Sequence, residues 1–265
     1  AMTLVSLGEN YADQGRFVDA FQIFERSLAI YEKSFGSDHP KVADSLNRLG
    51  NLYSDQGLYD NALELYERSL SIYEKSLRPD HPDFAVILNN MGLIYEIQSR
   101  YTKAESFLKR SLTIYEKAFG PIHPSVGHSN SNLAALNFSQ EKYEEALIYS
   151  RKNVEIYKKR FDSGYGEQTK GIRSEQEYVS DDFHFHLNLI AKSIQDALVD
   201  NQMSLTSEGF EVAQLATLTN TSSTLARLGA RFSAGEGELA NAVRRYQDLF
   251  DQNEVFEDLL LKELN

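Results

Sequence analysis

Hydrophobic residues recur over the first 160 residues of the chain in a pattern that repeats every 42 residues. Within each period, apolar side chains lie three and four positions apart over two successive segments, and this is the spacing of an amphipathic α-helix. The first segment ends near a Gln-Gly type turn, and the second runs from an aromatic residue to an Ile-Tyr pair. Each period therefore predicts two helices. One helix pair cannot bury its apolar face alone, so we expect the pairs to stack in a row.

The register holds over four periods without an insertion. Large apolar residues and small residues each fall at equivalent positions of the first helix, the large ones at Leu7, Leu49, Met91 and Leu133 and the small ones at Gly8, Gly50, Gly92 and Ala134. We expect the large residues to face the second helix of the pair. The small residues let two helix backbones approach closely.

A His-Pro pair closes each of the first three periods, at His39, His81 and His123. Proline fits the first turn of the next helix, where its missing N–H is not needed. Three histidines in a ladder could suggest metal ligands, but stacked helices lie about 10 Å apart, whereas ligands lie about 2 Å from a metal. We therefore expect each histidine to pack or cap at a helix junction, and we expect no metal and no cofactor.

These residues carry a resemblance. The stretch LGNLYSDQGLYDNALELYERSL (49–70) resembles a tetratricopeptide repeat (TPR). The usual period of that repeat is about 34 residues, and the longer period here is similar to the subclass found in kinesin light chains and many bacterial proteins. HEAT repeats have a comparable period but lack this order of residues. The resemblance implies an all-α fold, a right-handed TPR superhelix with extra C-terminal helices.

The fourth repeat departs from the pattern. Ala134 replaces the glycine, Asn137 replaces a tyrosine, and Ser150 stands where Tyr66 stands two repeats earlier. Terminal repeats are often atypical, because one face has no neighbour. We expect the regular stack to end or change register here, which divides the chain into a repeat array (1–160), a polar loop (161–182) and a C-terminal helical module (183–265).

Helical periodicity returns in that module, from Phe183 to Leu198 and again after Phe210, and predicts an irregular fifth TPR-like helix pair followed by further helices. The stretch FEVAQLATLTNTSSTLARLGARFSAGEGELANAVRRYQDL (210–249) resembles the segment that joins TPR arrays to CHAT domains, which are caspase-like peptidases of bacteria. An alanine-rich helix pair of no particular family is the alternative. The peptidase domain of that family lies downstream with its His and Cys, and this chain has no cysteine, so no catalytic residue can be carried over.

The composition narrows the classes of partner. The net charge is −12, which disfavours nucleic acid and an anionic membrane surface. No apolar run approaches the roughly 20 residues of a membrane span, and the absence of cysteine suits a reducing compartment. We therefore expect a cytoplasmic protein that binds other proteins.

Candidate catalytic chemistry is sparse. The sequence has no Gly-rich phosphate loop and no GxSxG, and its carboxylates are scattered over expected helix surfaces. His184 and His186 are two apart, and such residues do not share a helix face. We read these residues as non-catalytic. The alternative that this module is itself a hydrolase lacks a nucleophile.

The remaining candidate for a functional site is a binding surface on the repeats. In stacked TPRs the first helices line the concave side, and the positions that do not face the second helix predict a peptide-binding groove. Asparagine offers a donor and an acceptor to a peptide backbone, whereas the basic clamp that binds a C-terminal carboxylate in some TPRs is absent. The predicted groove residues are Asp44, Asn47, Asn51, Ser54, Asn89, Leu93, Glu96, His128 and Ser131.

These features favour a protein- or peptide-binding module that regulates a TPR–CHAT protease, with the ligand a separate protein or an intramolecular peptidase domain. The alternative is a stand-alone TPR scaffold or adaptor with no protease link.

Overall fold

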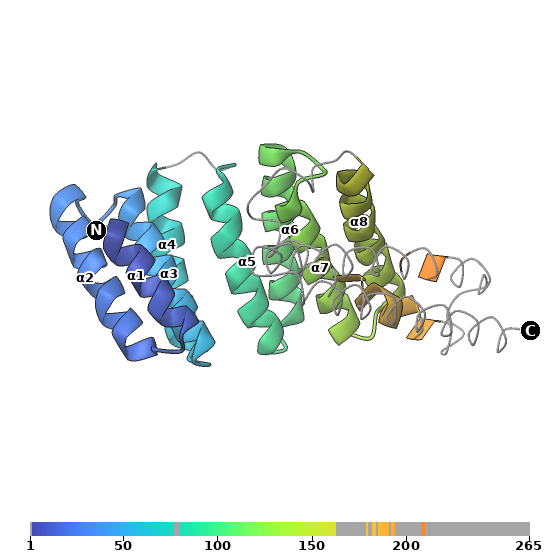
Figure 1. Ribbon diagram of the computed structural model, residues 1–265, viewed down its shortest axis with the longest axis horizontal. Helices are drawn as coiled ribbons and strands as arrows, with labels where there is room; N and C mark the ends of the chain where they lie inside the picture. The colour runs from blue at the N-terminus through green and yellow to red at the C-terminus, as the bar shows by residue number, and fades with distance from the viewer. Residues whose placement is uncertain are drawn as a thin grey trace, which may run out of the picture.

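The computed structural model describes residues 2–76 and 80–162 and, in the later part of the chain, residues 179, 182–183, 185–190, 192–193, 208–209 and 212. Over residues 2–76 and 80–162 the chain is a succession of helix pairs with no strand. Figure 1 shows the pairs in a row along the long axis of the molecule, from α1 and α2 at one end to α8 at the other. The helices are α1 (Met2–Asp13), α2 (Phe17–Phe35), α3 (Pro40–Asp55), α4 (Tyr59–Ser76), α5 (Pro82–Ile97), α6 (Tyr101–Phe119), α7 (Pro124–Ser139) and α8 (Tyr143–Asp162).

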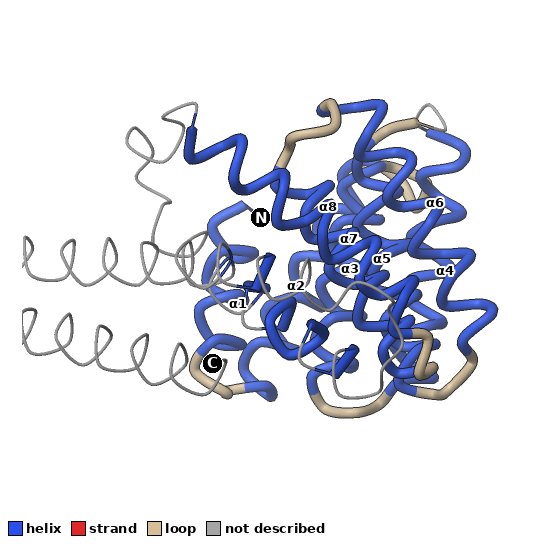
Figure 2. Tube along the Cα trace, turned by 90° about the vertical axis from the view of Figure 1, so that its right-hand side faces the viewer, coloured by secondary structure: helices blue, strands red, loops and turns tan. Residues whose placement is uncertain are grey.

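The order of the helices is the one that the hydrophobic pattern predicts, and an all-α solenoid of stacked pairs is confirmed for these residues. Viewed along the row, α4 and α6 lie on one side, with α3, α5 and α7 beside them (Figure 2). The odd-numbered helices are the first helices of the four repeats. A continuous core runs between the two layers and includes Leu46, Tyr66, Leu88 and Leu133.

The small residues act as expected at the closest approach of each pair. A Cβ atom added to Gly50 would lie 2.5 Å from Cε1 of Tyr66, and one added to Gly92 would lie 2.7 Å from Cγ of Leu108. These distances are too short for non-bonded carbons, so the absent side chain is what allows the bulky residue to be buried there. A serine of the second helix ties the second and third pairs further: Ser69 Oγ donates to the Ala43 carbonyl and Ser111 Oγ to the Ala85 carbonyl, both at 2.7 Å.

The turn inside each repeat uses a left-handed residue at one equivalent position. Gly15 and Gly57 have φ of 71° and 74°, and Ser99 and Glu141 adopt φ of 59° and 60° at the same place in the third and fourth repeats. Glycine is the residue that tolerates this region without strain. The structure therefore explains why the first helix ends near Gln-Gly, and it keeps the same turn where the glycine is replaced.

One predicted core position differs from its equivalents. Leu49, Met91 and Leu133 are buried, but Leu7 is 40% exposed. Leu49 shares a core cluster with Ala20 and Phe24 of the preceding repeat, whereas α1 has no helix before it in the described part of the chain. The residue is large and apolar in all four repeats, so only the stacking order could reveal the exposure.

The boundaries expected after the array stay predictions. Helix α8 runs to Asp162, and residues 182–183 and 185–190 are helical. Residues 163–178, which make up most of the expected polar loop, and the stretch 213–265 lie outside the described residues, as does most of 191–212.

Candidate functional site

The first helices of the second, third and fourth repeats meet through asparagine side chains. Asn90 of α5 donates through Nδ2 to Oδ1 of Asn47 at 3.3 Å and to Oδ1 of Asn51 at 3.0 Å, both on α3. Asn132 of α7 donates to Oδ1 of Asn89 at 2.8 Å. We call Asn47, Asn51, Asn89, Asn90 and Asn132 the asparagine ladder. It joins three successive repeats along the face of the row that is formed by their first helices, α3, α5 and α7. We call this the first-helix face.

The ladder leaves one kind of group available. Oδ1 of Asn47 and Asn89 each accepts from the next repeat, and Oδ1 of Asn51 accepts from Asn90 and also from the Tyr66 hydroxyl at 2.6 Å. Within the described residues, the Nδ2 groups of Asn47, Asn51 and Asn89 make no hydrogen bond. None of these three side chains is buried. They therefore present amide N–H donors, with acceptors already occupied, from two neighbouring helices.

The nine predicted groove residues lie on α3, α5 and α7, and all of them are at least partly exposed. The structure joins some of them in ways that the sequence did not indicate. Asn47 and Asn51 are bridged by Asn90, while Glu96 accepts a hydrogen bond from Ser139 Oγ at 3.1 Å. Ser131 donates to a carboxylate oxygen of Asp182, beyond the regular repeats. Within the described residues, Ser54 and Leu93 have no such link to the ladder.

Two members of the ladder, Asn90 and Asn132, were missed in the sequence analysis. They occupy equivalent positions one repeat apart, as Asn47 and Asn89 do. A search for asparagines that recur at the repeat length would have found both pairs. The partners could not have been found in that way, because the contacts join residues offset by 43 or 39 positions.

The charged groups near the ladder are held by neighbours. Asp44 accepts a hydrogen bond from the Tyr73 hydroxyl, and burial, followed by this contact, raises the pKa of Tyr73. Arg48 pairs with Glu9 of α1. Burial raises the pKa of the Glu96 carboxyl, and the hydrogen bond from Ser139 opposes that shift. Arg48 is thus engaged by a carboxylate.

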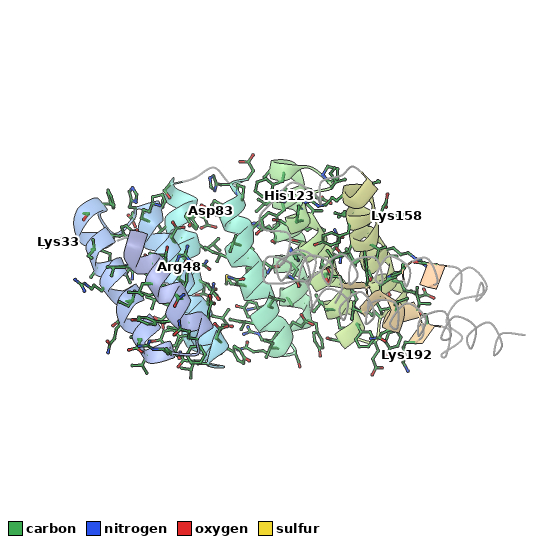
Figure 3. All side chains as sticks on the ribbon, in the orientation of Figure 1. Lys33, Arg48, Asp83, His123, Lys158 and Lys192 are labelled. Atoms are coloured by element: carbon green, nitrogen blue, oxygen red, sulfur yellow. The ribbon has the colours of Figure 1, made fainter. Side chains whose placement is uncertain are left out.

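The His-Pro ladder is a set of helix caps, as expected. Nδ1 of His39, His81 and His123 accepts from the backbone N–H two residues later, at 3.1, 3.3 and 3.2 Å. The ring of His123 also stacks on Phe119, with centroids 4.3 Å apart. Figure 3 labels His123 at this edge of the row, together with Asp83 from the first turn of α5. Within the described residues no group of His, Asp or Glu side chains could hold a metal ion.

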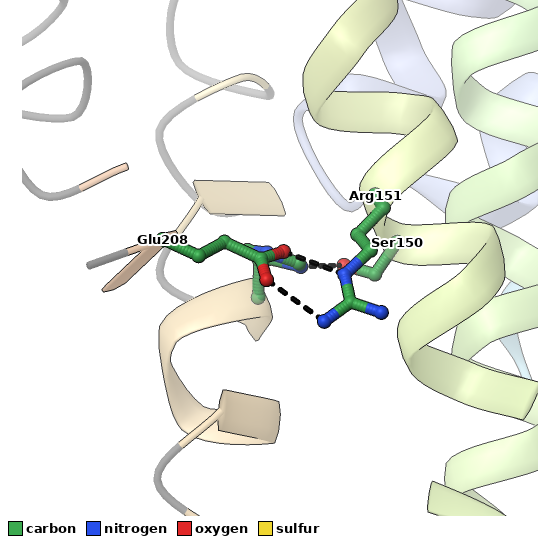
Figure 4. A network of polar contacts seen from close by, with 4 residues as sticks. Ser150, Arg151 and Glu208 are labelled. Carbon is green, nitrogen blue, oxygen red and sulfur yellow. Dashed lines mark hydrogen bonds and ion pairs between the residues drawn. The ribbon is translucent and has the colours of Figure 1, made fainter. Parts of the chain in front are cut away.

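A buried polar network at the end of the array is the nearest approach to catalytic chemistry (Figure 4). His186 Nδ1 lies 2.8 Å from Ser150 Oγ, and His186 Nε2 lies 3.0 Å from Oε1 of Glu208. The order Ser-His-Glu resembles a hydrolase triad, but Ser150 is 2% and His186 0% exposed. A nucleophile must reach its substrate, and Glu208 is also bound by Arg151. This geometry supports a structural role. His184 lies outside the described residues.

A family model described as "Tetratricopeptide repeat" matches residues 1–82 and 83–159. The chain therefore belongs to the tetratricopeptide repeat family. No curated protein sequence matches the chain significantly. Among the described residues, none of the helices has the length and apolar character to cross a membrane.

Solved structures share the fold at low sequence identity. The nearly identical TPR-like repeats of a Podosopora anserina protein of the kinesin light chain type are 21% identical, with a TM-score of 0.59 over 80% of this chain and 93% of that one. BtubC (BKLC) from P. vanneervenii is 18% identical, with a TM-score of 0.64 over 81% and 80%. Apo RapI is 20% identical, with a TM-score of 0.54 over 83% of both chains. These similarities establish the architecture and leave the ligand open.

Proposed function

We propose that the repeat array binds an extended segment of a partner protein along the first-helix face, and that the asparagine amides hold the backbone of that segment. The observation that carries this proposal is the row of unpaired Nδ2 groups on Asn47, Asn51 and Asn89. An extended chain offers carbonyl acceptors at regular intervals, which matches donors spaced along neighbouring helices. The predicted groove residues that flank them, such as Leu93 and Ser54, would contact the side chains of the partner.

The test must separate the donors from the structural role of the ladder. Asn47→Asp and Asn89→Asp keep the oxygen that accepts from the next repeat and remove the N–H donors. Peptides selected on the wild-type protein from a random peptide display library are the probe. We expect each substitution to weaken binding about fivefold, as for the loss of one hydrogen bond, while the urea midpoint stays within the error of the wild type.

The matched control is Asn61→Asp, an exposed asparagine on α4, which should bind the same peptides as the wild type. Fluorescence anisotropy with labelled peptides gives the dissociation constants. The proposal is wrong if the Asn47 and Asn89 variants bind as tightly as the Asn61 variant.

The role of the C-terminal module is the finer part of the proposal. The resemblance of residues 210–249 to the segment before CHAT domains supports a link to a caspase-like peptidase, with the array as its regulatory part; a scaffold without a protease is the alternative. The coding sequence after Asn265 tests this directly. A His and Cys peptidase region there would support the link, and its absence would favour the scaffold. Cytoplasmic location likewise stays a prediction.

A further inference from the structure

The segment after the repeats continues their pattern with a different spacing. Ser131 bonds to Asp182 as Asn89 bonds to Asn132, so Asp182 takes the place of Asn132 at an offset of 50 residues instead of 42. The same offset matches Phe183 with Leu133, and both are fully buried. The helical residues 182–183 and 185–190 therefore begin a fifth unit that docks on α7 and α8.

At this offset His186 is equivalent to a position that is apolar in the second, third and fourth repeats, each of which follows another repeat. Its equivalents are Leu52, Ile94 and Leu136, and each is at most 1% exposed. The residue that it contacts changes as well. Ser150 of α8 stands where the preceding repeats have Phe24, Tyr66 and Leu108. At each junction between two regular repeats, these two positions hold large, buried side chains. At the junction after the fourth repeat, both positions hold polar residues.

The polar groups at this junction are satisfied by one another. Glu208 accepts from Arg151 Nε at 2.7 Å and from Arg151 NH2 at 2.8 Å, a two-pronged ion pair. These contacts and the one from His186 outweigh partial burial and lower the pKa of Glu208 to about 2. Because a carboxylate only accepts, His186 donates from Nε2, and in the neutral ring Nδ1 accepts the Ser150 hydroxyl proton.

The same segment also touches the first-helix face. Phe185 packs edge-on against Phe138 of α7, with ring centroids 5.7 Å apart, and Asp182 holds Ser131. Ser131 is one of the predicted groove residues. Docking of the segment therefore covers the end of the first-helix face at the fourth repeat.

We propose that Ser150, Arg151, His186 and Glu208 form a polar latch that holds the segment 182–190 on the fourth repeat in this one register and can release it while the regular repeats stay folded. A regular repeat would place leucine or isoleucine at the His186 position and leave the Ser150 hydroxyl without the ring nitrogen that it contacts. The latch therefore favours this segment over another repeat of the same chain or of a second copy. Buried polar groups that fix one register at some expense of stability are known in coiled coils.

Hydrogen exchange followed by mass spectrometry tests the latch in the full chain. His186→Leu restores the apolar residue of the other repeats, and Glu208→Gln removes the charge. We expect either substitution to speed exchange in residues 182–190 about tenfold or more, because His186→Leu leaves the buried Ser150 hydroxyl without its partner and Glu208→Gln removes the charge that pairs with Arg151. Exchange in the part of α7 that contacts Asp182 and Phe185 should rise as well, and exchange in α3 to α6 should not change. Asn188→Ala, an exposed residue of the same segment, is the control.

The double variant decides between a latch and ordinary packing. Residues that act as one network give non-additive effects, so His186→Leu with Glu208→Gln should release the segment little more than either substitution alone. Additive effects would overturn the proposal. So would unchanged or slower exchange in the His186→Leu variant, because the segment would then dock as an ordinary apolar fifth repeat.

Discussion

The second and fourth repeats fill the crossing of their two helices with different combinations of side-chain size. In the second repeat, Gly50 leaves room for Tyr66; in the fourth, Ala134 stands opposite Ser150. From the second repeat to the fourth, the first-helix residue becomes larger, from glycine to alanine, and the second-helix residue becomes smaller, from tyrosine to serine. The comparison teaches that the helix pair is specified by the sum of two side chains at the crossing, since interiors are packed to nearly constant density.

A second pair of positions shows the same exchange. Ala43 and Ser69 of the second repeat correspond to Gly127 and Asn153 of the fourth. A Cβ atom on Gly127 would lie 2.9 Å from Oδ1 of Asn153, so the larger second-helix residue again requires the smaller first-helix residue. In the fourth repeat the larger side chain of the second helix therefore stands at the Asn153 position, whereas in the second repeat it stands at the position equivalent to Ser150. That shift frees the place at which His186 docks.

The largest expected effect comes from converting the crossing of the second repeat into that of the fourth. Tyr66→Ser should destabilise the protein by about 3 kcal/mol, because it leaves a cavity opposite Gly50. Gly50→Ala should destabilise the wild type, since its methyl group meets the Tyr66 ring, but should stabilise the Tyr66→Ser variant by refilling the space and favouring the helix. Urea unfolding followed by circular dichroism measures all three variants.

The informative result is the sign of the stability change caused by Gly50→Ala, which should differ between the wild type and the Tyr66→Ser variant. Asn61→Ala, on the exposed face of α4, controls for a general effect of alanine. If Gly50→Ala destabilises both backgrounds equally, the two positions are not coupled, and the comparison between the repeats fails.

A smaller effect is expected from the serine that bonds across the helix pair in the second and third repeats. Ser111 Oγ donates to the Ala85 carbonyl at 2.7 Å and is fully buried. Ser111→Ala should lower stability by about 1 kcal/mol, the usual net value of one hydrogen bond. The urea midpoint is again the measurement, and Thr113→Ala on the exposed face of α6 is the control. An unchanged midpoint for Ser111→Ala would mean that packing alone holds the third repeat.

The smallest change in overall stability is expected at the junction of the fourth repeat. The pKa of Glu208 is lowered from 4.5 to about 2 in the folded chain. Its ion pair with Arg151 and its contact with His186 therefore contribute fully above about pH 4.5 and are lost as the pH falls toward 2. Exchange in residues 182–190 should increase over this interval relative to α3 to α6. Glu208→Gln should remove that pH-dependent difference, and a difference that persists in the variant must come from other carboxylates.

Much of the fold could be predicted from single positions of the sequence. The period gave the helix pairs, the glycines gave the close crossings, and the His-Pro pairs gave caps in place of a metal site. Each of these features depends on neighbours within one repeat, at fixed offsets along the chain. The candidate site was predicted less well: the groove positions lie on the first helices, but the use of Asn47 and Asn89 as acceptors for the next repeat was not expected.

The sequence by itself determined the units, because helix formation, capping and the fit of one helix pair are local and recur with the repeat length. Only the tertiary structure decided how units meet. It fixed the offset that pairs Asn90 with Asn47, it left Leu7 exposed on α1, the first described helix, and it brought Glu208 to Arg151 across a stretch of unlike spacing. Such contacts depend on the relative placement of whole repeats, and no periodic pattern in the chain encodes that placement directly.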